Sequence, residues 1–213
     1  MIRIIRNKLT ITPKTTNSDE AKKQIDEVFR YCRGEDEKGQ MKEMLFQKIS
    51  PIPTNLKSDS KELDDWLLNN WGTREKAYNA CWISDNEIIF DTFGEPAIPI
   101  AYKIMRQFPD IDFKFEYASN KTGTKTGTVY TSKGHTFFSK EKDYSKRAYY
   151  LAFELRPHLE ALYTLNMETD TYEYDVSDIK AELATKGFYK EPDGTMLMTP
   201  SYAFKKAEDD LPF

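Results

Sequence analysis

The order of extended and helical segments in the first 117 residues restricts the fold more than any other feature of the chain. Four short segments are rich in β-branched or aromatic residues, as strands are: Ile2–Thr12, Met44–Ser50, Glu87–Phe93 and Ile111–Tyr117. Three segments carry apolar residues at helical spacing: Asn17–Cys32, Ser60–Asn70 and Pro96–Phe108. The order is strand–helix–strand, an additional helix, then strand–helix–strand. It predicts an α+β protein with a ferredoxin-like split βαβ sheet and an inserted helix.

A C-terminal α+β extension is expected after this sheet. Gly127–Thr131 and His135–Lys140 flank a Ser-Lys-Gly turn and predict a β-hairpin. The remaining expected elements are a helix at Asp143–Leu165 with Pro157 as a candidate interruption, a strand at Tyr172–Tyr174, a helix at Ser177–Lys186 and a strand at Met196–Met198. We therefore divide the chain into a ferredoxin-like domain (1–119), a basic hairpin and helical extension (120–199) and a flexible tail with an acidic tip (200–213).

Composition indicates a cytoplasmic globular protein. The chain is 39% hydrophobic and 31% charged, and no apolar run approaches the roughly 20 residues that cross a bilayer, so no membrane association is expected. Two cysteines, Cys32 and Cys81, and two histidines, His135 and His158, show no metal-ligand spacing. We therefore expect neither a disulfide framework nor a metal, and no cofactor.

Charge is distributed unevenly along the chain. The net charge is −4, but residues 120–147 hold seven Lys or Arg against two acidic residues, a local charge of +5 that leaves −9 elsewhere. Aromatic residues are interleaved with these cations, and a protein that holds single strands needs cations for phosphates and flat rings for bases. The candidate DNA-binding residues are Lys121, Lys125, Tyr130, Lys133, Phe137, Phe138, Lys140, Lys142, Tyr144, Lys146 and Arg147.

Alternatives to this basic surface remain open. The hairpin could instead be a solvated amphipathic element whose rings pack on the following helix. Because Phe137 and Phe138 alternate along a strand, we expect at most one of them in solvent. The loop from Lys121 to Gly127 is interpreted as flexible, or as a phosphate ligand through its amides. The open sheet face is a second DNA surface, with Arg3, Arg6 and Lys8 as its phosphate contacts, although the first strand carries no ring for stacking.

Signals for catalysis are weak, and we expect no enzymatic activity. The scattered glycines show neither Walker nor dinucleotide-binding spacing. A two-metal nuclease site could be assembled from Asp64, Asp65, Asp91 and Glu95, but the first two have the pattern of a solvated helix face. Cys32 lies on the apolar face of its helix, which is typical of a buried structural thiol.

Several short motifs share their order and spacing with a known family. They are Asn7-Lys8-Leu9-Thr10-Ile11, Ile49-Ser50-Pro51-Ile52-Pro53, Asn70-Trp71-Gly72-Thr73, Phe90-Asp91-Thr92-Phe93 followed by Pro96, and Phe108-Pro109. With them, residues 1–130 resemble the YubB-type ferredoxin-like domain family of phage and plasmid proteins. Members usually continue the Trp-Gly-Thr motif with Lys and an aromatic residue, where this chain has Arg74-Glu75. The resemblance implies a fold and an origin in a mobile element, and no activity.

The last six residues form a second motif. They are Glu208, Asp209, Asp210, Leu211, Pro212 and Phe213, and they resemble the C-terminal tip of bacterial single-stranded DNA-binding proteins. In such a peptide the terminal ring fills an apolar pocket, while the carboxylates meet Arg and Lys around it. Pro212 stiffens the approach and lowers the entropy that is lost on binding. The resemblance implies docking to host replication, recombination or repair proteins.

Together these features predict a phage- or plasmid-encoded protein that binds single-stranded DNA and recruits host replication or repair proteins through its acidic tip. In an alternative, the chain binds no DNA and the tip acts as a decoy that occupies a host helicase or nuclease. About a dozen residues follow Thr199, which span at most roughly 40 Å, and so short a tether favours the decoy. A weaker third reading is an accessory that loads a recombinase or annealase. The oligomeric state stays open, a homo-oligomer included.

Overall fold

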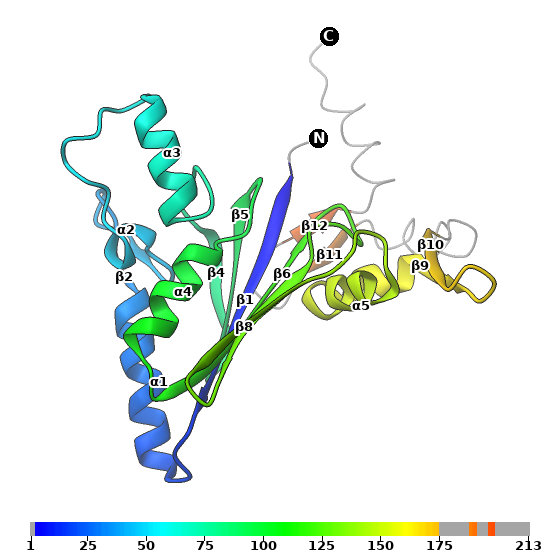
Figure 1. Ribbon diagram of the computed structural model, residues 1–213, viewed down its shortest axis with the longest axis horizontal. Helices are drawn as coiled ribbons and strands as arrows, with labels where there is room; N and C mark the ends of the chain where they lie inside the picture. Colours follow the sequence, from blue (N-terminus) through cyan, green and yellow to red (C-terminus); the bar gives the residue numbers. More distant parts are fainter. Residues whose placement is uncertain (1–2, 175–187, 191–195, 199–213) are drawn as a thin grey trace.

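The computed structural model (Figure 1) describes residues 3–174, 188–190 and 196–198. They form an α+β protein built on a six-stranded antiparallel sheet in the order β4-β5-β1-β6-β7-β8. Its strands are β1 (Ile4–Pro13), β4 (Tyr78–Ser84), β5 (Glu87–Phe93), β6 (Ile111–Ser119), β7 (Gly127–Ser132) and β8 (His135–Lys140). The helices are α1 (Ser18–Cys32), α2 (Phe46–Ile49), α3 (Lys61–Asn70), α4 (Ile98–Gln107), α5 (Lys146–Leu155) and the 3₁₀ helix η1 (Pro157–Leu162). Two-stranded ladders join β2 (Gly34–Glu35) to β3 (Met41–Lys42), β9 (Tyr163–Asn166) to β10 (Thr171–Tyr174) and β11 (Phe188–Lys190) to β12 (Met196–Met198).

The strand register divides the sheet side chains into two faces, because paired residues of antiparallel strands point the same way. One line of paired residues, which we call the first-face row, crosses five strands as Ile88, Leu9, Phe115, Val129 and Phe138. The neighbouring line, the second-face row, points to the opposite side as Glu87, Thr10, Lys114, Tyr130 and Phe137.

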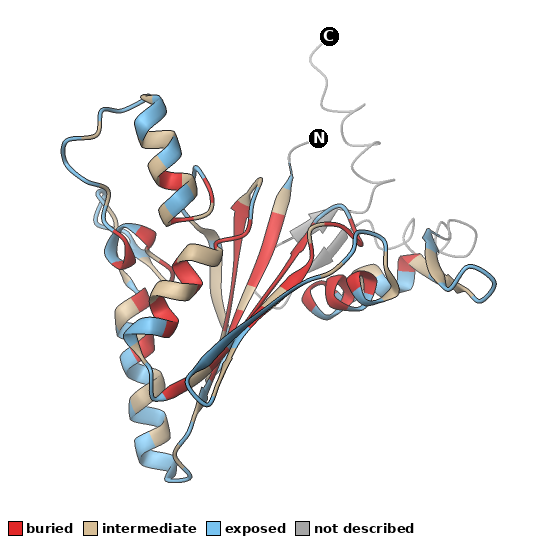
Figure 2. Cartoon of the chain, in the orientation of Figure 1, coloured by how far each residue is buried: buried red, intermediate tan, exposed pale blue. Residues whose placement is uncertain are grey.

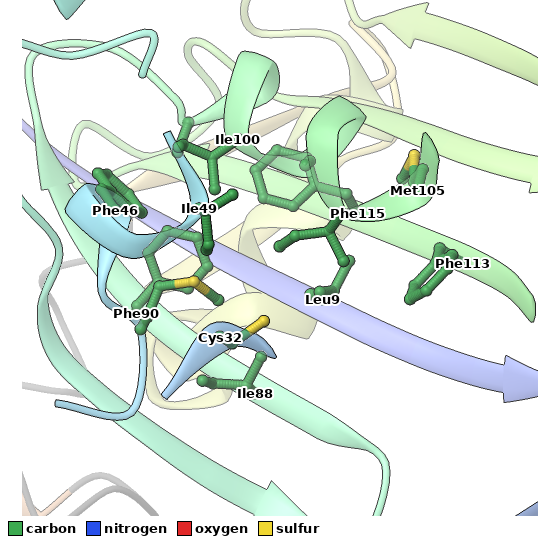
Figure 3. Close-up of a cluster of buried hydrophobic side chains, with 14 of the residues drawn as sticks. Leu9, Cys32, Phe46, Ile49, Ile88, Phe90, Ile100, Met105, Phe113 and Phe115 are labelled. Atoms are coloured by element: carbon green, nitrogen blue, oxygen red, sulfur yellow. The ribbon is translucent and has the colours of Figure 1, made fainter. Parts of the chain in front are cut away.

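Helices α1 to α4 lie on the first face and form the main core with it (Figure 1). Asn17 is the N-cap of α1, because its side chain accepts hydrogen bonds from the main-chain N–H groups of Asp19 and Glu20. In Figure 3, Met105 of α4 lies near Phe113 and Phe115 of β6, and Phe46 of α2 lies near Phe90 of β5. Because α1 and α4 pack on β1 and β6, the centre of the sheet is the best-covered part of this face.

Part of the second face is covered by α5, which packs on β6 and β1 through a small cluster of Ala118, Leu151, Ala152 and Leu155. Ser145 is the N-cap of this helix, since its hydroxyl accepts a hydrogen bond from the N–H of Ala148. The sequence predicted one helix from Asp143 to Leu165, but α5 ends at Leu155, a 3₁₀ helix follows and β9 begins at Tyr163. Pro157 causes the break, because its ring has no N–H to continue the α-helical hydrogen bonds.

The predicted strand Met44–Ser50 is wrong, since this segment forms the short helix α2. Phe46 and Ile49 are both buried, a spacing of three that puts them on one helical face. The strand next to β5 is instead β4, which pairs with it through two register irregularities. These irregularities break the alternation that would have revealed β4 in the sequence.

The Trp-Gly-Thr motif connects α3 to the sheet. The indole N–H of Trp71 donates to the carbonyl of Ser50 at 2.8 Å, and the Thr73 hydroxyl donates to the carbonyl of Phe93 at 2.9 Å. Gly72 has φ +83°, and a Cβ there would collide with the carbonyl of Pro96. The motif therefore joins the end of α3 to Ser50 and to the end of β5, and Gly72 permits the close approach of Pro96.

Candidate nucleic-acid interface

The predicted hairpin is confirmed. Its two strands continue the main sheet, although they lie beyond residue 119, where we expected the ferredoxin-like domain to end. β7 pairs with β6, and β8 pairs with β7 as the edge strand. All six residues of β8 are exposed, and Figure 2 shows the strand pale blue along its length. Phe137 and Phe138 keep 44% and 51% of their surface exposed, so the expectation that one of them is buried is wrong. The helical layer of the first face does not shelter Phe138, although Phe138 points to that side.

Two rings on the second face stack on each other. Tyr130 and Phe137 are directly paired across β7 and β8, with ring centroids 5.0 Å apart and planes inclined by 17°. Tyr130 is 41% exposed. The contact orders both side chains before any ligand arrives, which lowers the entropy that binding would cost. The pair therefore offers an ordered apolar surface on which a nucleobase can stack.

Lysines border these rings along the edge of the sheet. Lys133 occupies the β7–β8 turn with φ +51°, and Lys140 ends β8. Lys142 follows β8, and all three side chains are exposed. Within the described part of the chain, no carboxylate forms an ion pair with any of these three lysines. Their charges are therefore available to a phosphate backbone.

Three other cations among the predicted DNA-binding residues form ion pairs with carboxylates. Lys125 pairs with Glu95. Lys146 lies 2.8 Å from the carboxylate of Asp170, and this partner raises the pKa of the lysine. The Arg147 guanidinium lies 3.1 Å from Glu141, although most of the arginine side chain stays exposed. The structure thus separates the basic segment into exposed cations along the edge and paired cations in the β6–β7 loop and at the start of α5.

The loop from Lys121 to Gly127, interpreted from the sequence as flexible or as a phosphate ligand, is packed against the rest of the protein. Its threonines are buried, and the N–H of Thr124 donates to the carbonyl of Lys121 at 3.1 Å. The N–H of Lys125 donates to the Asp143 carboxylate at 3.0 Å. These amides already have acceptors and do not form a phosphate cradle. At the loop surface, the Lys121 ammonium lies 5.6 Å from the centre of the Tyr144 ring, a cation–π contact between two predicted residues.

A trench separates the hairpin from α5 on the second face, next to the stacked rings. Its volume is about 640 Å³. The residues along its two walls include Thr128, Tyr130 and Ser139 from the sheet and Arg147, Tyr150 and Glu154 from α5. The sequence did not reveal this trench, because it depends on which helical face α5 turns toward the strands. Lys114, also in its lining, precedes the basic segment and meets Tyr130 only through the strand register.

The alternative DNA surface around β1 is largely closed. Arg6 is buried and its guanidinium donates to both carboxylate oxygens of Asp91, at 2.7 and 3.1 Å. Lys8 lies 3.3 Å from the carboxylate of Glu116. Arg156 approaches the same Asp91 at 3.7 Å. Burial, together with Arg156 and Arg6, lowers the pKa of His158 to about 4, so this imidazole is neutral at pH 7. Of the three predicted phosphate contacts, only Arg3 is exposed.

The acids considered for a nuclease site do not converge. Asp64 forms an ion pair with Arg74 at 3.2 Å, Asp91 holds Arg6, and Glu95 holds Lys125. Across residues 3–174, 188–190 and 196–198, no three His, Cys, Asp or Glu side chains are grouped to hold a metal ion. Cys32 is buried as predicted, and burial raises the pKa of its thiol to about 12. A protonated, buried thiol is a poor nucleophile at neutral pH.

Comparisons with known proteins return no match to a family model, a curated protein or a solved structure. The two resemblances therefore stay predictions. The acidic tip and the predicted helix Ser177–Lys186 lie outside the described residues. No helix in the described part of the chain combines the length and the apolar composition of a membrane span.

Proposed function

We propose that the protein binds single-stranded DNA along the β7–β8 edge of its sheet. The observation that carries this proposal is the stacked pair of Tyr130 and Phe137, exposed on the second face of this edge. The same edge carries Phe138 on its first face and the exposed lysines Lys133 and Lys140. Base–aromatic stacking contributes about 1–3 kcal/mol per base and works for every base. An edge that joins rings to exposed cations therefore suits a ligand whose bases are unstacked and whose backbone is charged.

Duplex DNA suits this edge less well. Its bases are stacked inside the helix, so only the lysines would contact it, through phosphates. We therefore expect preference for single strands and a dependence on salt that reflects a handful of lysine contacts. An enzymatic role is not part of the proposal, since binding and recruitment need no catalytic group.

We also propose a ferredoxin-like fold for the main sheet, and an origin and a cellular location that are consistent with this function. Strands β1, β4, β5 and β6 in the order β4-β5-β1-β6, with α1 and α4 as connections, support the ferredoxin-like split βαβ arrangement. α2 and α3 are then the insertion, and the hairpin with α5 the extension. We further propose that the chain is phage- or plasmid-encoded and works in the host cytoplasm.

The experiment is an anisotropy titration of a labelled single strand of mixed sequence at low salt. The double variant Tyr130→Ala/Phe137→Ala is expected to bind about 30-fold or more weakly, because two stacking contacts are lost. Ile83→Ala is the matched control, since Ile83 is an exposed apolar residue on β4, the opposite edge of the sheet. If the wild-type protein shows no binding to a long single strand, DNA binding is excluded.

The acidic tip at 208–213 is proposed to dock on host genome-maintenance proteins, with the Phe213 ring and carboxylate as its main contacts. Deleting Phe213, or adding residues after it, is expected to abolish capture of these proteins while DNA affinity stays equal or rises slightly. The measurement is a pull-down from host lysate with the wild type and the deletion. Identical sets of captured proteins would contradict the docking role.

A decoy role is the second candidate, and the ion pairs favour it. Lys125, Lys146 and Arg147 are partly neutralised by carboxylates, and the chain is acidic overall. In this case the tip occupies a host helicase or nuclease without DNA. The two functions separate cleanly: a decoy captures host proteins through Phe213 and shows no anisotropy change with any oligonucleotide.

A further inference from the structure

The trench between α5 and the hairpin has the size of a small-molecule site. Its volume of about 640 Å³ lies within the range of roughly 300–1,000 Å³ that ligand pockets occupy. It opens beside Tyr130, one of the two stacked rings. A base that leaves the stack over these rings therefore finds a cavity within reach.

Two exposed tyrosines line this trench from different elements. Tyr130 comes from β7 and is held by Phe137. Tyr150 comes from α5, and its ring packs edge-on against Tyr172 at 5.7 Å. Each ring is thus positioned by an aromatic neighbour. Rings ordered in advance on two walls favour a flat ligand between them.

The charges of the trench differ from those of the sheet edge. Its lining includes the carboxylates of Glu116, Glu154 and Glu160 against the cations Lys114 and Arg147. Lys114 lies 2.6 Å from Glu116, and Arg147 is paired with Glu141, so both cations are already engaged. Glu154 and Glu160 add negative charge that these two cations do not offset, and this charge disfavours a phosphate inside the trench. The phosphate is attracted instead to the open lysines of the β8 edge.

We infer that the trench receives a single nucleobase carrying an exocyclic amino group, with the DNA backbone outside along β8. Tyr130 and Tyr150 contact the faces of the base, and the exposed carboxylate of Glu154 accepts a hydrogen bond from its amino group. Cytosine offers such a donor at N4, whereas thymine presents a carbonyl oxygen at the same position. This inference rests on the proposed DNA binding and adds a base preference to it.

The test compares labelled oligo-dC and oligo-dT of equal length by anisotropy at pH 7.5 and low salt. The wild type is expected to bind oligo-dC about tenfold more tightly. Glu154→Gln keeps the shape of the side chain and is expected to reduce the preference to less than about threefold, mainly by weakening oligo-dC. Tyr150→Ala is expected to weaken both. Glu27→Gln, the same change on the exposed part of α1, is the control and leaves the preference intact.

The outcomes distinguish this inference from the proposed function. Equal affinity of the wild type for both oligonucleotides overturns the base preference and leaves single-strand binding standing. A preference for oligo-dC that survives both Glu154→Gln and Tyr150→Ala locates base recognition elsewhere and also overturns it. If neither oligonucleotide binds, the proposed function fails and the inference fails with it. Thermal melts of each variant establish that the fold is retained.

Discussion

Phe115 on β6 and Phe138 on β8 point to the same side of the sheet, and their surroundings are opposite. Both belong to the first-face row, with only Val129 between them. Phe115 is 1% exposed beneath the helices, whereas Phe138 is half exposed. Residue type and strand alternation are the same in both places. What differs is the width of the helical layer, which covers β6 and β7 and does not reach β8.

The contrast identifies β8 as a surface that folding alone does not explain. An edge strand with two exposed phenylalanines invites aggregation, and lysines along such an edge oppose it. Lys133 and Lys140 meet that need, and the same charges suit a phosphate backbone. A ligand that covers the Tyr130–Phe137 pair would reduce this liability, which supports our placement of the DNA along this edge.

The largest expected effect is on the free energy of unfolding, which should distinguish Phe115 from Phe138. Phe115→Ala should lower the free energy of unfolding by about 3–5 kcal/mol, because it leaves a cavity in the packed core. Phe138→Ala should change it by no more than about 1 kcal/mol, since half of the ring already contacts water. Urea unfolding followed by circular dichroism measures both. Equal losses would mean that the helical layer extends over β8.

A smaller effect tests how the exposed hairpin depends on the buried part of the sheet. Gly127 lies against the Tyr117 hydroxyl, and a Cβ there would also lie 2.6 Å from the carbonyl of Ser139. Gly127→Ala should therefore cost about 1–3 kcal/mol and weaken DNA binding as β7 and β8 shift. Thr136→Ala, an exposed change on β8, should be nearly neutral. Unfolding curves and anisotropy on the same samples decide between a coupled hairpin and an independent one.

The smallest expected effect is on the salt dependence of DNA binding. It distinguishes the exposed lysines of the edge from the lysines that pair with carboxylates. Each lysine–phosphate contact adds about 0.7 to the slope of log affinity against log salt for single strands. Lys140→Ala/Lys142→Ala should flatten this slope by roughly 1.4. Lys125→Ala/Lys146→Ala, which removes two carboxylate-paired lysines, should flatten it by less than about 0.7. The reverse order would place the DNA backbone near the β6–β7 loop and the start of α5, and not along the edge.

Sequence periodicity was sufficient where a segment alternates regularly. The strands around Leu9, Phe90 and Phe113 were predicted correctly, since each has one apolar face buried under helices. The hairpin was also predicted, from its Ser-Lys-Gly turn. Periodicity failed at Met44–Ser50, a run too short to distinguish a helix from a strand, and at β4, where Asn79 has φ +50° and the register shifts.

The candidate interface was predicted in part. The sequence identified Tyr130, Phe137 and the lysines of the hairpin from their composition, without their geometry. It could not show that Tyr130 and Phe137 stack, or that Lys125 meets Glu95, because these contacts join residues that the register and the loops bring together. Tyr150 was missed for the same reason, since only packing decides which face of α5 lines the trench.

The sequence by itself determined the α+β class, the positions of most strands and the concentration of cations and rings between residues 120 and 147. These properties depend on near neighbours in the chain, where alternation, turns and charge can be read directly. Only the tertiary structure decided which rings are buried, which cations are paired and where a cavity opens. Burial and ion pairing depend on contacts between segments distant in sequence. Phe115 and Phe138 differ in whether helices lie above them and in whether their strand lies inside the sheet or at its edge.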